Sequence, residues 1–163
     1  MITRRFILSG GALAVLGACA SKFRTYSGPE VTSIAVYKER RRLYLMHEND
    51  VLRAYDFELG FAPVGDKQHE GDGRTPEGAY IIDRKNPNSA FHLSVGISYP
   101  NNQDRAEAAA LGRPPGGDIF IHGTPRINRR DDDWTAGCIA VTNREIEEIY
   151  AMVEVGTPIF IYP

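Results

Sequence analysis

A histidine and a cysteine in the C-terminal part of the chain have the side chains best suited to covalent chemistry. His122 ends the apolar run Ile119–Ile121, and Cys138 follows Gly137 and precedes a second apolar run, Ile139–Val141. An imidazole can take the proton of a thiol, and the thiolate is the nucleophilic form. We therefore interpret Cys138 as a candidate nucleophile and His122 as its general base. The alternatives are a buried structural cysteine and a hydrogen-bonded histidine at a strand end.

Glycines stand beside both candidates. Gly123 follows His122 and allows the chain to turn away sharply. Gly137 precedes Cys138, so the backbone N–H groups of these two residues could point together at a developing oxyanion. A catalytic histidine also needs a partner for its second ring nitrogen. Because no carboxylate in the sequence is an obvious choice, we expect a backbone carbonyl near Gly123 in that role.

The N-terminus has the pattern of an export signal. Arg4 and Arg5 precede an apolar stretch, Phe6–Leu16, that is short for a membrane span but typical of a signal peptide. The segment Leu16–Cys19 resembles a lipoprotein signal box, in which the cysteine is lipidated, and the paired arginines resemble a twin-arginine signal. We expect residues 1–19 to be this signal, with ordinary secretory cleavage near residue 20 as the alternative.

Cysteine usage makes Cys138 more informative. The chain has two cysteines, and Cys19 is either lipidated or removed with the signal, so the mature chain keeps one. A disulfide within one chain is then excluded. A lone thiol in an oxidising compartment is open to oxidation, so we expect Cys138 to be either deeply buried or used.

Length and composition indicate one ordinary globular domain. The chain has 163 residues, of which 42% are hydrophobic and 25% charged, and one core can accommodate this length. We expect a short tether at residues 20–30 and a catalytic domain at 31–163. The formal net charge of -2 argues against nucleic-acid binding. The dense basic cluster Lys38–Arg42 is interpreted as a solvated turn.

Most of the chain has the pattern of strands rich in β-branched and aromatic residues. The expected strands are Thr32–Tyr37, Arg42–His47, Val51–Glu58, Ala79–Asp83, His92–Ile97, Asp118–His122, Cys138–Val141 and Pro158–Tyr162. Two helices are expected: Asn102–Leu111, which Gly112 can end, and Asn143–Val153, preceded by a capping box of Thr142 and Glu145. This pattern predicts a mainly β domain, a mixed β-sandwich that is partly barrel-like, with two small helices.

Other residues are weaker candidates for substrate contact. His92 begins an expected strand, where a structural histidine is equally plausible, and Trp134 and Thr135 lie just before Cys138. The chain lacks the paired CxxC and HExxH spacings of metal sites, so no metal is expected.

Arginines in the loop between the two principal candidates are a further possibility. Arg126, Arg129 and Arg130 could meet a substrate carboxylate, since the guanidinium group suits that geometry. Asp131–Asp133 could instead balance them on a solvated loop, and we favour this interpretation.

Two segments, Ile121–Gly123 and Thr135–Cys138, resemble the signature of the YkuD-type L,D-transpeptidase domain: a histidine, a loop, then Ser/Thr-His-Gly-Cys. The turn Thr75–Gly78 is similar to the family's Thr-Pro-x-Gly turn. Four more segments resemble the YafK-like branch of the family: Gly65–Lys67, His92–Pro100, Gly116–Ile119 and Asp133–Asn143. The likeness extends from about Val31 to Tyr162.

The resemblance implies a function in the bacterial cell wall. It assigns Cys138 as nucleophile and His122 as base, and it implies a mixed β-sandwich without a cofactor. Family members attack the third residue of a peptidoglycan stem peptide, usually meso-diaminopimelate, and release the terminal D-Ala. The thioester then passes to an amine, on another stem peptide or on a lipoprotein lysine. We accordingly expect an exported protein of the periplasm or cell envelope, held by a lipid at Cys19.

The sequence also departs from the family pattern. Ala136 replaces the histidine before Gly137, and Ala140 replaces a residue that is often polar or basic. These changes put the acceptor in doubt, so a hydrolase that cleaves peptidoglycan–lipoprotein or stem-peptide bonds is the first alternative. A non-catalytic peptidoglycan-binding lipoprotein is the second. An unrelated thiol protease ranks last, because there the cysteine begins a helix and the histidine follows it in sequence.

Overall fold

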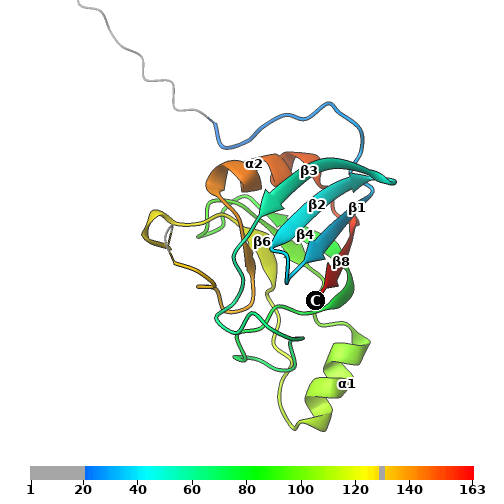
Figure 1. Ribbon diagram of the computed structural model, residues 1–163, viewed down its shortest axis with the longest axis vertical. Helices are drawn as coiled ribbons and strands as arrows, with labels where there is room; N and C mark the ends of the chain where they lie inside the picture. The colour runs from blue at the N-terminus through cyan, green and yellow to red at the C-terminus, as the bar shows by residue number, and fades with distance from the viewer. Residues whose placement is uncertain (1–20, 129–130) are drawn as a thin grey trace, which may run out of the picture.

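The computed structural model describes residues 21–128 and 131–163. One curled eight-stranded sheet forms the body of the domain, in the strand order β3-β2-β1-β8-β4-β5-β6-β7. Helix α2 lies along one end of the sheet and α1 projects from the opposite end (Figure 1). The elements are β1 Ser33–Tyr37, β2 Arg42–His47, β3 Asp50–Asp56, β4 Gly78–Asn86, β5 Ser94–Ile97, α1 Asn102–Ala110, β6 Phe120–His122, the 3-10 helix η1 Arg126–Asn128, β7 Ile139–Ala140, α2 Asn143–Met152 and β8 Pro158–Tyr162.

Strand β4 makes the sheet curl. Its first part, Gly78–Ile81, pairs with β8, and its second part, Ile82–Asn86, pairs with β5. The register shifts between Ile82 and Arg84, and such a bulge bends a strand and increases its twist. The bend turns β5, β6 and β7 away from the other strands, which gives the half-barrel shape.

Apolar side chains on the inner face of this curl form one core. The most deeply buried are mainly isoleucine and leucine from the strands, together with Ile146 and Ile149 of α2. Helix α2 begins at the predicted capping box, in which Thr142 and Glu145 bond each other's backbone N–H groups. Burial of its apolar face holds α2 beside β5 and β6.

The expected mainly β fold with two helices is confirmed. Strands β2 and β8 have the predicted bounds, and both helices end one residue before the predicted end. Strand β5 begins at Ser94, later than predicted, because His92 has a φ of 75° and cannot continue an extended strand. The last predicted strand before α2 is reduced to Ile139–Ala140.

The interpretation of Lys38–Arg42 as a solvated turn is wrong for its first residue. Lys38 is only 3% exposed. Its ammonium binds the Glu77 carboxylate at 2.7 Å and the carbonyls of Gly65 and Thr75 at 2.6 and 3.0 Å. These bonds satisfy a charge that would otherwise be costly to bury. They also tie the first hairpin to the long loop between β3 and β4.

The segment expected to be a tether, residues 20–30, packs against the domain over the part that the structure describes. Lys22 Nζ donates to the carbonyl of His92 at 3.1 Å, and Arg24 binds the Glu147 carboxylate at 2.8 Å. Figure 1 shows this segment, in blue, passing along α2 before it enters β1. The N-terminal segment is therefore part of the folded surface.

The expected export signal at residues 1–19, with Cys19, lies outside the described residues. Within residues 21–128 and 131–163, no helix has the length and apolar composition needed to span a membrane.

Candidate active site

The structure brings His122 and Cys138 to the same groove. Strands β6 and β7 pair in parallel, with His122 opposite Ala140, so the two strands end side by side, and Cys138 directly precedes β7. Both side chains line a groove of about 400 Å³ together with Phe91 and Ser94. Two residues that are distant in sequence are thus positioned by one short ladder.

The orientation of His122 leaves one ring nitrogen available. Its Nδ1 lies 2.8 Å from the carbonyl oxygen of Gly123, the backbone partner expected from the sequence. Because a carbonyl can only accept a hydrogen bond, Nδ1 must carry the proton. In the neutral ring, Nε2 is then unprotonated and can act as a base. The ring is buried, and desolvation lowers the pKa of His122, an effect partly offset by the bond to Gly123.

Two aromatic side chains pack against the imidazole of His122. The ring of Phe91 stacks on His122 with centroids 4.4 Å apart, and Trp134 meets it edge-on at 5.6 Å. The sequence suggested Trp134 as a substrate contact. In the structure the indole ring packs against the imidazole of His122. Phe91 was not identified from the sequence, because the long connection between β4 and β5 carries no motif.

Cys138 is a free, half-buried thiol. Its Sγ lies 3.5 Å from the carbonyl oxygen of Asp118. Desolvation raises the pKa of the thiol, while the backbone of Phe120 and the positive charge of Lys67 act in the opposite direction. Because burial dominates, the thiol is protonated at neutral pH and needs a base to become nucleophilic.

Gly137 has a backbone conformation and surroundings that exclude a side chain. Its φ is 126°, and an added Cβ would lie 2.5 Å from the carbonyl oxygen of Arg74. Its N–H donates to the Thr135 hydroxyl at 3.2 Å, and that hydroxyl donates to the carbonyl of Cys138 at 2.8 Å. The Gly137 N–H is therefore engaged within the turn. Thr135 is buried and shapes this turn instead of lining the groove.

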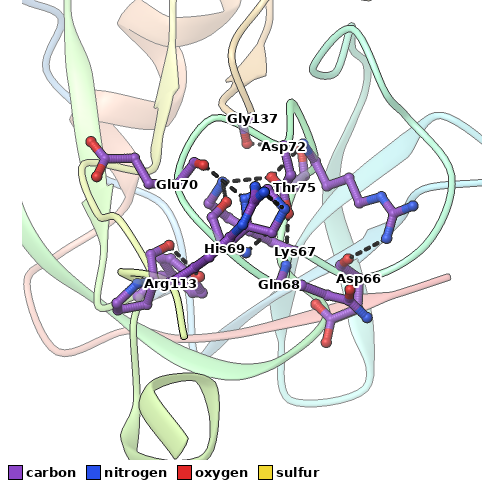
Figure 2. Close-up of polar contacts among 12 residues, drawn as sticks. Asp66, Lys67, Gln68, His69, Glu70, Asp72, Thr75, Arg113 and Gly137 are labelled. Carbon is purple, nitrogen blue, oxygen red and sulfur yellow. Dashed lines mark hydrogen bonds and ion pairs between the residues drawn. The ribbon is translucent and has the colours of Figure 1, made fainter. Parts of the chain in front are cut away.

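The loop between β3 and β4 is hydrogen-bonded to the turn at Thr135–Cys138. The Thr75 hydroxyl donates to the carbonyl of Gly137 at 2.8 Å. Figure 2 shows that this loop also carries Lys67, whose ammonium binds Asp72 at 2.8 Å. Lys67 is 3% exposed, and no role was predicted for it beyond the resemblance of Gly65–Lys67 to the YafK-like branch.

His92 is not among the residues that line the groove around His122 and Cys138, although its neighbour Phe91 is. Its Nε2 lies 2.8 Å from a carboxylate oxygen of Glu147 on α2. The sequence suggested a substrate contact, and the structure shows instead a contact with the helix. Arg126 is exposed in η1, while Arg129 and Arg130 lie outside the described residues.

The sequence suggested that Asp133 belongs to a solvated loop. The structure shows instead that its carboxylate is bound to other parts of the domain. Its carboxylate forms a two-pronged ion pair with Arg41, and it also accepts the backbone N–H of Leu59 at 3.0 Å. These bonds fasten the segment before Cys138 to the rest of the domain. The pair lowers the pKa of Asp133 despite its partial burial.

Among the residues described, no three His, Cys, Asp or Glu side chains come together as a metal site.

Comparisons with known proteins agree with the geometry. Residues 32–161 match the family model of the YkuD L,D-transpeptidase catalytic domain. The provisionally named L,D-transpeptidase YafK of Escherichia coli K12 is 32% identical over 126 residues, covering 74% of this chain and 46% of that protein.

Solved structures give the same relationship. The helical cell shape determining protein Pgp2 from Campylobacter jejuni is 27% identical with a TM-score of 0.62, over 82% of this chain and 51% of that one. An L,D-transpeptidase from Mycobacterium smegmatis shares the fold at 15% identity, with a TM-score of 0.55 over 82% of this chain and 59% of that one. The chain spans about half the length of YafK and Pgp2.

Proposed function

Because the chain belongs to the family of L,D-transpeptidase catalytic domains, we propose that it transfers acyl groups of peptidoglycan stem peptides through Cys138. His122 Nε2 takes the proton from the thiol as Sγ attacks the peptide carbonyl carbon. The C–N bond then breaks, and His122 returns the proton to the departing amine, which leaves a thioester on Cys138.

The second half of the reaction reverses these roles. An acceptor amine attacks the thioester and gives a proton to His122 as the C–S bond breaks. The thiolate of Cys138 then recovers that proton, and the acceptor carries the new amide bond. An oxyanion forms in both halves, and the backbone N–H of Cys138 is the donor that remains for it, since the N–H of Gly137 is bound to Thr135.

The observation that carries the proposal is the tautomer of His122. The bond from Nδ1 to the carbonyl of Gly123 leaves Nε2 as the basic atom, on a ring that shares a groove with Cys138. The burial that lowers the pKa of His122 and raises that of Cys138 favours a neutral imidazole and a neutral thiol. Proton transfer would then accompany the attack on substrate.

Hydrolysis is a second candidate, because water could replace the amine at the thioester. Ala136, which stands where the family pattern has histidine, is exposed on the wall of a groove that Cys138 also lines. A methyl group there leaves space for solvent beside the acyl-enzyme. The bonds cleaved would be those of stem peptides or of peptidoglycan-linked lipoproteins.

The cellular setting is part of the same proposal. An export signal at residues 1–19 would carry the protein to the periplasm or cell envelope, and a lipid at Cys19 would hold it at a membrane. Its substrates, the peptidoglycan stem peptides, are found there.

The test uses the full chain and its Cys138→Ala variant with tetrapeptide muropeptides and lipoprotein-linked sacculi, and reads the products by mass spectrometry. New cross-links or exchanged terminal residues that depend on Cys138 support transfer. Release of D-Ala or lipoprotein without a new bond supports hydrolysis. If neither substrate gives a product that depends on Cys138, the catalytic proposal is wrong and a peptidoglycan-binding protein is the better account.

A further inference from the structure

A second groove, of about 810 Å³, adjoins Cys138 on the side of Ala136, and His122 is not among its lining residues. Its walls come from the loop between β3 and β4, from α1, and from the connection between α1 and β6. Two cationic side chains line it, Lys67 on the loop and Arg105 on the helix. The reaction proposed above gives no role to either cation.

Lys67 is a buried ammonium with a donor to spare. Its Nζ donates to Asp72 Oδ1 at 2.8 Å and to the carbonyl of His69 at 3.1 Å (Figure 2). A lysine ammonium carries three N–H bonds, so two acceptors leave one donor over. In the part of the chain that the structure describes, these are the two acceptors that Lys67 has. The third N–H can therefore be donated to a ligand in the groove.

Hydrogen bonds within the loop hold Lys67 in place on the wall of the groove. The Asp72 carboxylate accepts the backbone N–H groups of Gln68 and Arg74 at 2.7 and 3.0 Å, as well as the ammonium of Lys67. These bonds lower the pKa of Asp72 to about 2, so its charge persists at working pH. Thr75 of the same loop donates to the carbonyl of Gly137, so a hydrogen bond joins the loop to the residue before Cys138.

The remaining charges of the groove leave the two cations accessible. Asp118 lies on the wall, but its carboxylate binds Arg84 at 3.0 Å. Glu70 is exposed at the loop and contributes one negative charge. Arg105 is exposed, and no carboxylate within the described residues pairs with it. A carboxylate entering the groove would therefore pass the exposed guanidinium of Arg105 and then reach the buried ammonium of Lys67.

We propose that this groove binds the free carboxylate of the residue that leaves when Cys138 attacks, with Lys67 as the inner contact and Arg105 as the outer one. The inference rests on the function proposed above and makes it more specific. An ammonium buried beside the scissile bond recognises a peptide end, since an internal peptide bond would place a neutral amide there. Lys67 and Cys138 line the same groove, so a substrate held at the thiol can also reach the ammonium.

The experiment compares a tetrapeptide stem with its C-terminal carboxamide, which differs only by the loss of the charge. Loss of one charge-assisted hydrogen bond corresponds to roughly ten- to hundredfold in affinity or rate. We expect the wild-type protein to show a preference of this size for the free acid in kcat/KM. Equal rates for acid and carboxamide in the wild type would overturn the proposal.

Variants then assign the preference to the two cations. Lys67→Met with Asp72→Asn removes the buried pair without stranding one charge, and we expect the acid and carboxamide to react at similar rates. Arg105→Gln, at an exposed position, should reduce the preference partly. Lys85→Met is the matched control, because Lys85 binds the carbonyl of Val153 away from the groove. An unchanged preference in the folded double variant and in Arg105→Gln would reject the assignment.

A binding measurement separates this inference from the catalytic proposal. The Cys138→Ala variant is titrated with D-alanine and with D-alaninamide, and chemical-shift changes are followed by NMR. Selective binding of the acid, lost on changing Lys67 and Asp72, supports the subsite even if no turnover is found. If the variant binds both probes equally, or neither, while the wild-type protein gives Cys138-dependent products, the subsite is overturned and the catalytic proposal stays intact.

Discussion

The imidazole of His122 stacks on the ring of Phe91 with an interplanar angle of 24°. The carbonyl of Phe91 also accepts the N–H of Gly123 at 3.0 Å, so Phe91 contacts both the His122 ring and the residue that orients this ring. Since the carbonyl of Gly123 fixes the tautomer of His122, the connection between β4 and β5 helps to set the geometry of the base.

Loss of the Phe91 ring should loosen His122 without unfolding the domain. An aromatic pair contributes roughly 0.5–1.5 kcal/mol beyond area burial, so Phe91→Ala should lower kcat about three- to tenfold. The measurement is steady-state turnover with a thermal unfolding curve. Phe23→Ala is the control, because Phe23 packs on Tyr150 of α2 and should leave kcat unchanged. An unaltered kcat in Phe91→Ala would show that the stacking has no catalytic role.

The pH dependence of turnover should reveal a neutral catalytic pair. The pKa of His122 is lowered, so its protonation should reduce kcat/KM only below about pH 6.5, the ordinary value for histidine. The pKa of Cys138 is raised, so its alkylation by iodoacetamide should accelerate as pH rises beyond about 8.5. Rapid alkylation that stays constant down to about pH 5 would instead indicate a preformed thiolate–imidazolium pair.

Gly137→Ala should abolish activity and destabilise the fold. The added methyl would meet the carbonyl of Arg74, and we expect a loss of about 3 kcal/mol or more. Gly71→Ala is a matched control: its φ is also positive, at 78°, but nothing lies within 4 Å of the added methyl. The control should lose only about 1 kcal/mol. Similar losses for both variants in chemical denaturation would show that backbone strain, not crowding, makes Gly137 necessary.

Removal of the Arg41–Asp133 pair should weaken the segment before Cys138. Both side chains are partly exposed, so Asp133→Asn should cost about 1 kcal/mol, while Arg42→Gln, in a more exposed pair, should have almost no effect.

The sign of the pH effect follows from the lowered pKa of Asp133. The contribution of Asp133 to the free energy of unfolding is present above the pKa of an unfolded aspartate, about 3.9. It is lost as pH falls through the lower pKa of the folded state. Thermal unfolding between pH 2 and 6 should therefore show a smaller difference between wild type and Asp133→Asn at the acid end. A difference that is constant over this range would contradict the assignment.

Local patterns were sufficient to predict most of the elements and to single out the two candidate residues that the structure brings to one groove. Strands β2 and β8 have β-branched and aromatic residues between clear turn residues, and α2 has its capping box in sequence. His122 and Cys138 follow from residue type and from the glycines beside them. In each case the information lies within a few neighbouring residues.

Contacts between distant segments could not be predicted in this way. The roles of Lys38, His92 and Asp133 depend on partners in other loops or in α2. The long connections between strands carry no periodic pattern that would indicate these partners. A lysine followed by polar residues has the same local signal whether it is buried in a network or exposed to solvent.

The packing of the N-terminal segment limits how far the enzyme could reach. Lys22 and Arg24 are bound to the connection between β4 and β5 and to α2, so little free chain precedes the domain from residue 19 onward. At about 3.3–3.6 Å per residue, an attachment at residue 19 would allow roughly 10 Å between the anchor and Lys22. If a lipid at Cys19 holds the protein as proposed, such a short linker would confine the reaction to peptidoglycan strands next to the membrane.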